Sequence, residues 1–297
     1  MKSLFLMLLL PTTITFITPA YSDDSLNSSY AKLLALSLTN DISASKLDSE
    51  GLSYEKYSFP YTFKNLYEYD DYSFSVQLRG NYLKVKASPM DVNPSGKLRA
   101  HWDILSVTTS PKITYKINNS LKLENEIEFG YANMNNKSTF SGDNDMKESL
   151  REIGLLGWSI NSFQLAPKIG LINTNILNNN HQVNFHGNVS YMFMHGINND
   201  KELNVNNNTG TWSVGGEYIM ADLFNIKDKP FSLILSNDIG GFYGNDYREL
   251  SFGFINNTSL AIETPVNVYN NEVKFKTGIG YLASDNAHGI TLTFEIR

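Results

Sequence analysis

The stretch 121-LKLENEIEFGY-131 decides the fold, because apolar and polar side chains alternate along it. One set of alternate positions holds Leu121, Leu123, Ile127, Phe129 and Tyr131, and the other holds Lys122, Glu124, Glu126, Glu128 and Gly130. A period of two places successive side chains on opposite faces of a β-strand. The segment is therefore predicted to be a strand with one apolar and one charged face.

The residues before this segment predict its partner strand. Residues 105–117 also alternate, and Asn118, Asn119 and Ser120 make a polar three-residue connection. Such a turn predicts a hairpin with the opposite pairs Ile117–Leu121, Lys116–Lys122, Thr114–Glu124 and Lys112–Glu126. Lys112 then faces a carboxylate, whereas Lys116 and Lys122 are a like-charge pair.

The same alternation continues along the chain and predicts about twelve strands. Further strands are expected within 73–86, 156–160, 163–171, 183–193, 212–220, 231–239, 250–254, 258–268, 272–281 and 289–296, with a turn at Asn161-Ser162. An aromatic run at 57–63 is a further candidate, which Pro60 disfavours. Polar segments at 88–99, 133–148, 173–181 and 195–210 are predicted loops. If each predicted strand crosses the membrane once, the long segment 195–210 falls on the periplasmic side, together with the short turns.

Composition excludes several classes of protein. The chain has 297 residues, a formal net charge of −6, no cysteine, 12% aromatic and 18% charged residues. A disordered chain carries fewer aromatics and more charge. The acidic balance argues against a nucleic-acid partner, and without cysteine there is no disulfide scaffold or thiolate metal site.

The charged face separates a membrane barrel from a soluble β-protein. Six charged residues fall on the face opposite the apolar one: Lys112, Lys116, Lys122, Glu124, Glu126 and Glu128. A dry core does not hold so many charges, but a water-filled lumen does. The sequence thus predicts an all-β protein, a closed antiparallel transmembrane β-barrel of about twelve strands surrounded by outer-membrane lipid. A secreted soluble β-sandwich or adhesin domain is the alternative.

The N-terminal region precedes the barrel and differs from it. Residues 1–22 fit a signal peptide, with a short apolar run and small residues Ala20 and Ser22 before the predicted cleavage point. Apolar residues within 24–47 fall roughly at helical spacing. We therefore expect a cleaved signal at 1–22, a helix and linker at 23–50, and the barrel at 51–297, exported to the outer membrane of a Gram-negative bacterium.

The C-terminal segment and the order of elements carry a family resemblance. The spacing of Gly289, Leu292 and Phe294 resembles the C-terminal insertion signal of bacterial outer-membrane barrels. A helix followed by about twelve strands resembles the translocator domain of autotransporters, here as a solitary barrel without a passenger domain. The resemblance implies that the helix lies in the lumen and that the barrel assembly machinery and periplasmic chaperones are partners during biogenesis. It also implies a monomeric, non-enzymatic pore, translocator or surface-interaction protein.

Candidate chemistry in the sequence is sparse, and no catalytic, cofactor-binding or metal-binding residue is assigned. His186 and Ser190 share the predicted lumen face and invite comparison with outer-membrane phospholipases, so a barrel hydrolase of phospholipase or protease type is the enzymatic alternative. Asp143-Asn144-Asp145 resembles the start of a calcium loop, but Lys147 stands where an oxygen ligand is needed.

Overall fold

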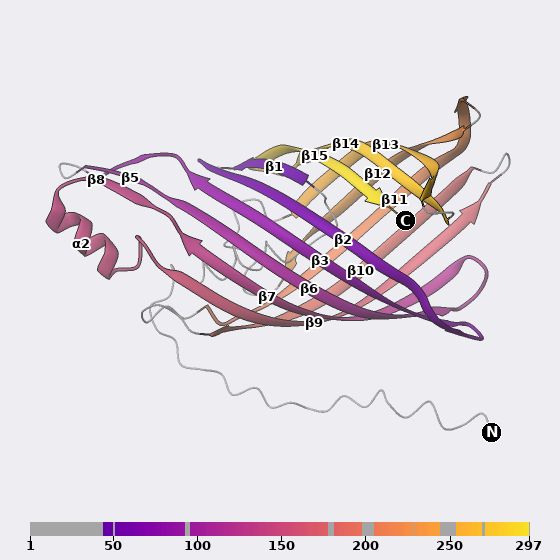
Figure 1. The fold of residues 1–297 in the computed structure, drawn as a ribbon, viewed down its shortest axis with the longest axis horizontal. Helices are drawn as coiled ribbons and strands as arrows, with labels where there is room; N and C mark the ends of the chain where they lie inside the picture. The colour runs from indigo at the N-terminus through magenta and orange to yellow at the C-terminus, as the bar shows by residue number, and fades with distance from the viewer. Residues whose placement is uncertain are drawn as a thin grey trace, which may run out of the picture.

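The computed structural model describes residues 44–49, 51–92, 96–177, 181–197, 205–227, 229–243, 254–268 and 271–296. Figure 1 shows long tilted strands wrapped into a barrel, with one short helix beyond one end. The elements are β1 Ala44–Ser49, β2 Leu52–Tyr69, β3 Tyr72–Ala87, β4 Met90–Val92, β5 Gly96–Arg99, β6 His101–Lys116, β7 Leu121–Asn136, β8 Thr139–Gly142, α2 Asn144–Glu152, β9 Ser159–Ile176, β10 Gln182–Ile197, β11 Asn207–Ile226, β12 Lys229–Tyr243, β13 Phe254–Val268, β14 Asn271–Ala283 and β15 Ala287–Ile296.

Twelve of the described strands form one closed antiparallel barrel, in the order β1-β15-β14-β13-β12-β11-β10-β9-β7-β6-β3-β2. The barrel closes where β1 pairs with β15 on one side and with β2 on the other. Closure matters in a membrane because an open sheet edge leaves unpaired backbone groups in lipid. The predicted fold class is confirmed.

The β6–β7 hairpin has the register predicted from its turn. Lys112 lies opposite Glu126, Thr114 opposite Glu124, and Lys116 opposite Lys122. The Ile117 amide donates to the Leu121 carbonyl at 2.9 Å, which closes the turn.

The connections differ between the two ends of the barrel. Short turns join β2 to β3, β6 to β7, β9 to β10, β11 to β12 and β13 to β14, whereas the long connections β3–β6, β7–β9, β10–β11 and β12–β13 all lie at the other end. In transmembrane barrels short turns face the periplasm and longer loops face outward. We therefore assign the end with the long connections as extracellular.

The expected division of 156–171 into two strands is wrong. The structure has a single strand, β9, in which Asn161 pairs with Asn133 and Ser162 with Ala132 of β7. Polar residues fit here because the outward Asn161 accepts a hydrogen bond from Asn133, while Ser162 faces the lumen. This extra division also explains why the count put 195–210 at the end of the short turns. The segment in fact belongs to the extracellular end.

The N-terminal edge of the barrel also differs from expectation. The aromatic run at 57–63 is part of β2, and Pro60 is accommodated opposite Arg79 of β3. The barrel begins at Ala44 instead of residue 51, because Ala44–Ser49 is the strand that closes the ladder. The predicted signal peptide, and the predicted helix up to residue 43, lie outside the described residues.

Two of the predicted loops contain ordered structure at the extracellular end. β4, β5 and β8 form a separate three-stranded sheet, and α2 follows β8 (Figure 1). Asp143 caps α2, because its carboxylate accepts from the amides of Asp145 and Met146 at 2.9 and 3.0 Å. The resemblance to a calcium loop is thus explained by helix capping. Among the described residues, no helix is long and apolar enough to cross a membrane.

Candidate functional site: the lining of the lumen

The two faces of the barrel wall differ sharply in exposure. On β6, outward Leu105 and Val107 are 63% and 54% exposed, whereas inward Ser106 and Thr108 are nearly inaccessible. The alternation continues on the neighbouring strands, so large apolar side chains cover the outer surface. This is the arrangement expected when lipid is the outer solvent.

The middle and periplasmic part of the lumen is lined by ionisable side chains, which we call the charged belt: Arg79, Lys112, Glu124, Glu126, Glu128, Lys168, His186, Glu217, Asp238, Glu263, Lys274 and Lys276. At its centre the Glu128 carboxylate forms an ion pair with Arg79 of β3. Gln164 and Ser110 also donate to Glu128, at 2.6 and 3.3 Å. Three strands therefore satisfy one buried carboxylate.

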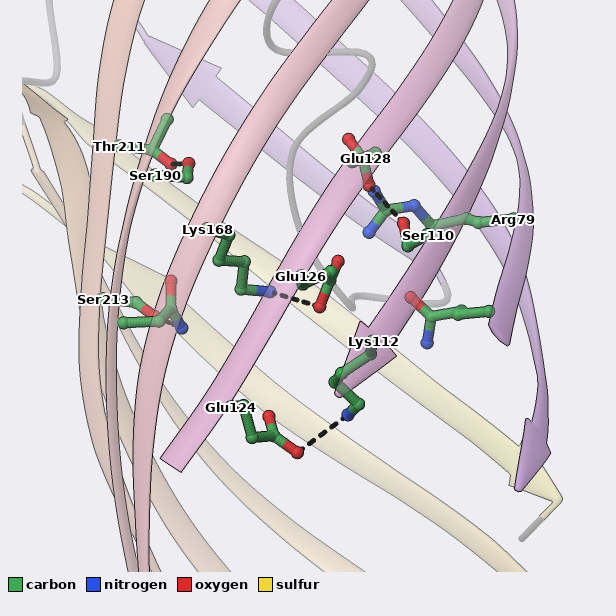
Figure 2. A network of polar contacts seen from close by, with 12 residues as sticks. Arg79, Ser110, Lys112, Glu124, Glu126, Glu128, Lys168, Ser190, Thr211 and Ser213 are labelled. Carbon is green, nitrogen blue, oxygen red and sulfur yellow. Dashed lines mark hydrogen bonds and ion pairs between the residues drawn. The ribbon is translucent and has the colours of Figure 1, made fainter. Parts of the chain in front are cut away.

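Two further ion pairs lie beside Glu128 (Figure 2). Lys112 of β6 contacts Glu124 of β7 at 2.9 Å, and Lys168 of β9 contacts Glu126 at 3.6 Å. Each pair joins neighbouring strands, so the three glutamates of β7 are neutralised from both sides.

Lys116 and Lys122 behave differently from the other predicted lumen charges. They lie opposite each other near the periplasmic turn, and both are exposed. Neither has an ion-pair partner within 4 Å in the part of the chain that the structure describes. Water solvates these two ammonium groups.

The opposite wall carries its own charge pairs. Lys276 of β14 contacts Glu217 of β11 at 3.0 Å, although β12 and β13 lie between these strands in the sheet. His186 of β10 contacts Asp238 of β12 at 2.8 Å and passes over Gly215 of the intervening β11. A Cβ on Gly215 would lie 1.9 Å from the Asp238 carboxylate, so glycine leaves the room for this bridge.

The extracellular part of the lumen is lined by apolar side chains, which we call the apolar cluster: Leu47, Tyr54, Leu83, Val85, Ile104, Ala132, Met134, Trp158, Ile160, Ala166, Met192, Met194, Val205, Phe242, Leu282 and Ala287. Leu83, Ile104, Met134 and Ile160 have no measurable exposure. These four side chains are therefore inaccessible to water. The members come from ten of the twelve barrel strands and from the residues just before β9 and β11, and Ala166, opposite Glu128, lies lowest.

The residues of the predicted insertion signal lie at the closing seam. Gly289 pairs with Leu47 of β1, and a Cβ on it would lie 2.0 Å from the Lys46 carbonyl oxygen. Glycine therefore permits the close approach of β1 to β15. Leu292 and Phe294 are exposed on the outer face, where lipid surrounds them. The predicted cleavage residues Ala20 and Ser22 lie outside the described part of the chain.

Several lumen residues escaped the sequence prediction, Arg79 and Lys168 above all. Both occupy inward positions of predicted strands beside polar neighbours such as Gln77 and Gln164, so alternation on their own strands could have identified them. Their partners on β7 could not be identified, because no short turn sets the pairing of β9 with β7, or of β3 with β6, across which Arg79 reaches β7.

The geometry gives no support to a catalytic set around His186. The Ser190 hydroxyl hydrogen-bonds to Thr211 at 2.6 Å, while His186 contacts Asp238 (Ser190 and Thr211 in Figure 2). No group of three or more His, Asp or Glu side chains within the described ranges is placed to hold a metal ion.

The sequence of this barrel matches a known family of outer-membrane proteins. A family model for the solitary outer membrane autotransporter beta-barrel domain matches residues 38–268. The chain belongs to this family. Membership of this autotransporter-type family implies the outer membrane of a Gram-negative bacterium. None of the curated proteins compared with the chain matches it.

Solved autotransporter barrels share the fold at low sequence identity. The translocator domain of NalP from Neisseria meningitidis has a TM-score of 0.58 and 8% identity, covering 90% of this chain and 93% of that one. The transport unit of AIDA-I from Escherichia coli has a TM-score of 0.53 and 12% identity, covering 91% and 98%. The match supports the architecture of this autotransporter-type barrel at the level of the fold.

Proposed function

We propose that this autotransporter-type barrel is a non-enzymatic, translocator-like protein whose lumen is closed to passive solutes at rest. The observation that carries the proposal is the apolar cluster. A hydrated ion entering that level would lose water without gaining polar partners, because Leu83, Ile104 and Met134 offer none. The charged belt below is polar and paired, so closure is local to the extracellular end.

The N-terminal segment has a place in this proposal. Residues 23–43 are proposed to enter the lumen as a helix, as the family resemblance implies. Two separate barriers, the segment and the apolar cluster, would then block permeation. Deletion of residues 23–43 removes the first barrier and leaves the second.

Planar-bilayer conductance tests the closed lumen. Purified wild type is expected to give no steady ionic current. Leu83→Ser/Met134→Ser is expected to conduct once residues 23–43 are also deleted, because the substitutions hydrate the cluster and the deletion removes the second barrier. The matched control, Lys112→Gln/Lys168→Gln, changes two residues of the already wet belt and is expected to stay closed. A conducting wild type would contradict the proposal.

Deletion of residues 23–43 identifies which barrier is responsible. A barrel that remains closed without them supports closure by the apolar cluster. Current that appears only after the deletion would assign closure to the N-terminal segment and overturn the role given to the cluster.

A surface-interaction role is a second candidate, favoured by the extracellular subdomain of β4, β5, β8 and α2. Its own small apolar core contains Leu98, Phe140, Leu150 and Leu156. A packed core makes this region a defined surface outside the cell. Adhesion between cells that display the wild type should exceed adhesion between cells displaying Leu98→Asp, with equal barrel levels; equal adhesion would remove this candidate.

A further inference from the structure

The outer face of β3 carries two lysines above its apolar band. Leu78, Tyr82, Lys84 and Lys86 point outward in order toward the extracellular end, alternating with buried residues. The Tyr82 ring stacks on Tyr57 of β2, with ring centroids 6.3 Å apart. Amphipathic aromatic rings favour the lipid–water boundary. Lys84 and Lys86 therefore lie at the height of the lipid headgroups.

No ion pair within the described residues holds these two lysines. Neither Lys84 nor Lys86 has an ion-pair partner within 4 Å in the described ranges. Two carboxylates lie opposite Lys84 in the register, Glu55 of β2 and Asp103 of β6, but neither forms an ion pair with it.

The other carboxylates nearby already have cations. Asp103 contacts His101 at 3.0 Å and Lys137 at 2.5 Å, and Asp48 lies 3.8 Å from Lys46. Glu55 is the one carboxylate of this sector without an ion pair among the described residues, and it stands against two such ammonium groups. Lys86, which lies between Ser53 and His101 in the register, is therefore the group most available to an anion.

A cavity of about 420 Å³ adjoins Lys86. It forms where the β1–β2 turn, the end of β3 and the β14–β15 turn meet, and its polar lining includes Asp48, Ser53, Lys86, Ser88, Asn286 and His288. The volume falls within the range of roughly 300–1,000 Å³ typical of small-ligand sites. Hydroxyl, amide and carboxylate groups beside one ammonium suit a ligand that carries both hydroxyls and an anion.

We propose that this cavity binds the anionic sugar headgroup, phosphorylated or carboxylated, of an outer-leaflet glycolipid. Lys86, which lines the cavity, takes the anion, and the Asp48 carboxylate accepts hydrogen bonds from sugar hydroxyls. Lys84 is the next outward residue of β3 toward the apolar band and adds to the positive charge outside the cavity. Asp48 disfavours a bare anion, because it would repel one that brought no hydroxyl donor. A free sugar phosphate has the same headgroup chemistry, but the outward position just above the apolar band favours a lipid.

Titration of the detergent-solubilised full-length protein with a diphosphorylated glucosamine-disaccharide lipid tests the site. Lys84→Gln/Lys86→Gln is expected to raise the Kd about tenfold, because charge-assisted hydrogen bonds are lost. The wild-type Kd is expected to rise with salt as exposed charges are screened. Heat-modifiable migration on gels reports that each variant is folded.

The matched control is Lys64→Gln/Lys147→Gln, which removes two lysines from the periplasmic end and from α2. It is expected to keep the wild-type Kd. An unchanged Kd in Lys84→Gln/Lys86→Gln, or an equal loss in the control, would overturn the proposal.

Competition identifies the source of the ligand. Displacement of the lipid by glucosamine 6-phosphate shows that the sugar headgroup is sufficient for binding. If binding of the lipid depends on the lysines but glucosamine 6-phosphate does not displace the lipid, the acyl chains contribute to binding as well as the headgroup. Displacement by inorganic phosphate as readily as by the sugar phosphate would overturn the assignment of a sugar ligand.

Discussion

One strand, β7, lines both the charged belt and the apolar cluster. Near the periplasm its inward residues are Glu124, Glu126 and Glu128, and toward the extracellular end they are Ala132 and Met134. Backbone geometry and pairing are the same throughout, since β6 and β9 flank β7 along its length. Only the side chains change, so the environment inside the barrel changes with height.

The two regions obtain stability in different ways. The charged belt depends on pairing, because each buried charge needs a partner to offset its lost hydration. The apolar cluster depends on exclusion of water and dense packing. A given substitution should therefore have opposite consequences in the two regions.

The largest effect is expected from a carboxylate in the wrong region. Met134→Glu buries an unpaired charge among apolar side chains, and it should lower the free energy of unfolding by more than about 4 kcal/mol or prevent folding. Denaturant titration in lipid vesicles, followed by heat-modifiable migration, measures this loss. Ser75→Glu is the control, because Ser75 faces the lumen opposite Lys112 and gains a cation. Equal losses at the two positions would remove the distinction between the regions.

Breaking the central pair of the charged belt ranks second. Arg79→Met leaves Glu128 buried without its cation, which should cost about 3 kcal/mol of unfolding free energy. Arg79→Met/Glu128→Leu should recover most of that loss, because an apolar pair needs no counter-charge. The same titration compares the variants, and a double variant no more stable than the single one would contradict the pairing argument.

Sequence alone predicted the charged belt better than the apolar cluster. Around residue 121 the contrast between the two faces is strong, and the short turn at Asn118–Ser120 fixes the register of β6 and β7. Toward the extracellular end the contrast disappears, because inward Ile104 is followed by outward Leu105 and both are apolar. A period of two cannot show that the inside of the barrel is apolar when both faces are.

Pairing between distant strands was equally hidden from sequence. Lys276 and Glu217 meet across the lumen, which depends on the curvature of the closed barrel. The polar pair Asn161-Ser162 predicts a turn because polar residues favour turns, but neighbouring strands hold it in a ladder. Tertiary pairing overrode local preference at this point.

A glycine in the charged belt gives the third prediction. Gly215→Ala would push a methyl group into the His186–Asp238 contact and should cost about 1–3 kcal/mol. Gly80→Ala is the matched control on β3, because a Cβ there meets nothing within 4 Å. Its stability should stay within about 1 kcal/mol of wild type. Thermal unfolding of the two variants compares them, and equal losses would show that backbone freedom, and not the bridge, requires Gly215.

The smallest effect is expected at the edge of the charged belt. Lys112 and Glu124 are paired at 2.9 Å, but their side chains remain 27% and 21% exposed. In Lys112→Gln the Glu124 carboxylate keeps a hydrogen bond from Thr114 at 3.4 Å and access to water. The loss should therefore stay below about 1 kcal/mol and shrink further at high salt, where the wild-type pair is itself screened. Denaturant titration at low and high salt measures both values. A loss as large as that of Arg79→Met would mean that the edge of the charged belt excludes water as well as its centre does. Exclusion of water would then extend down to the periplasmic turn, and it would not distinguish the apolar cluster from the charged belt.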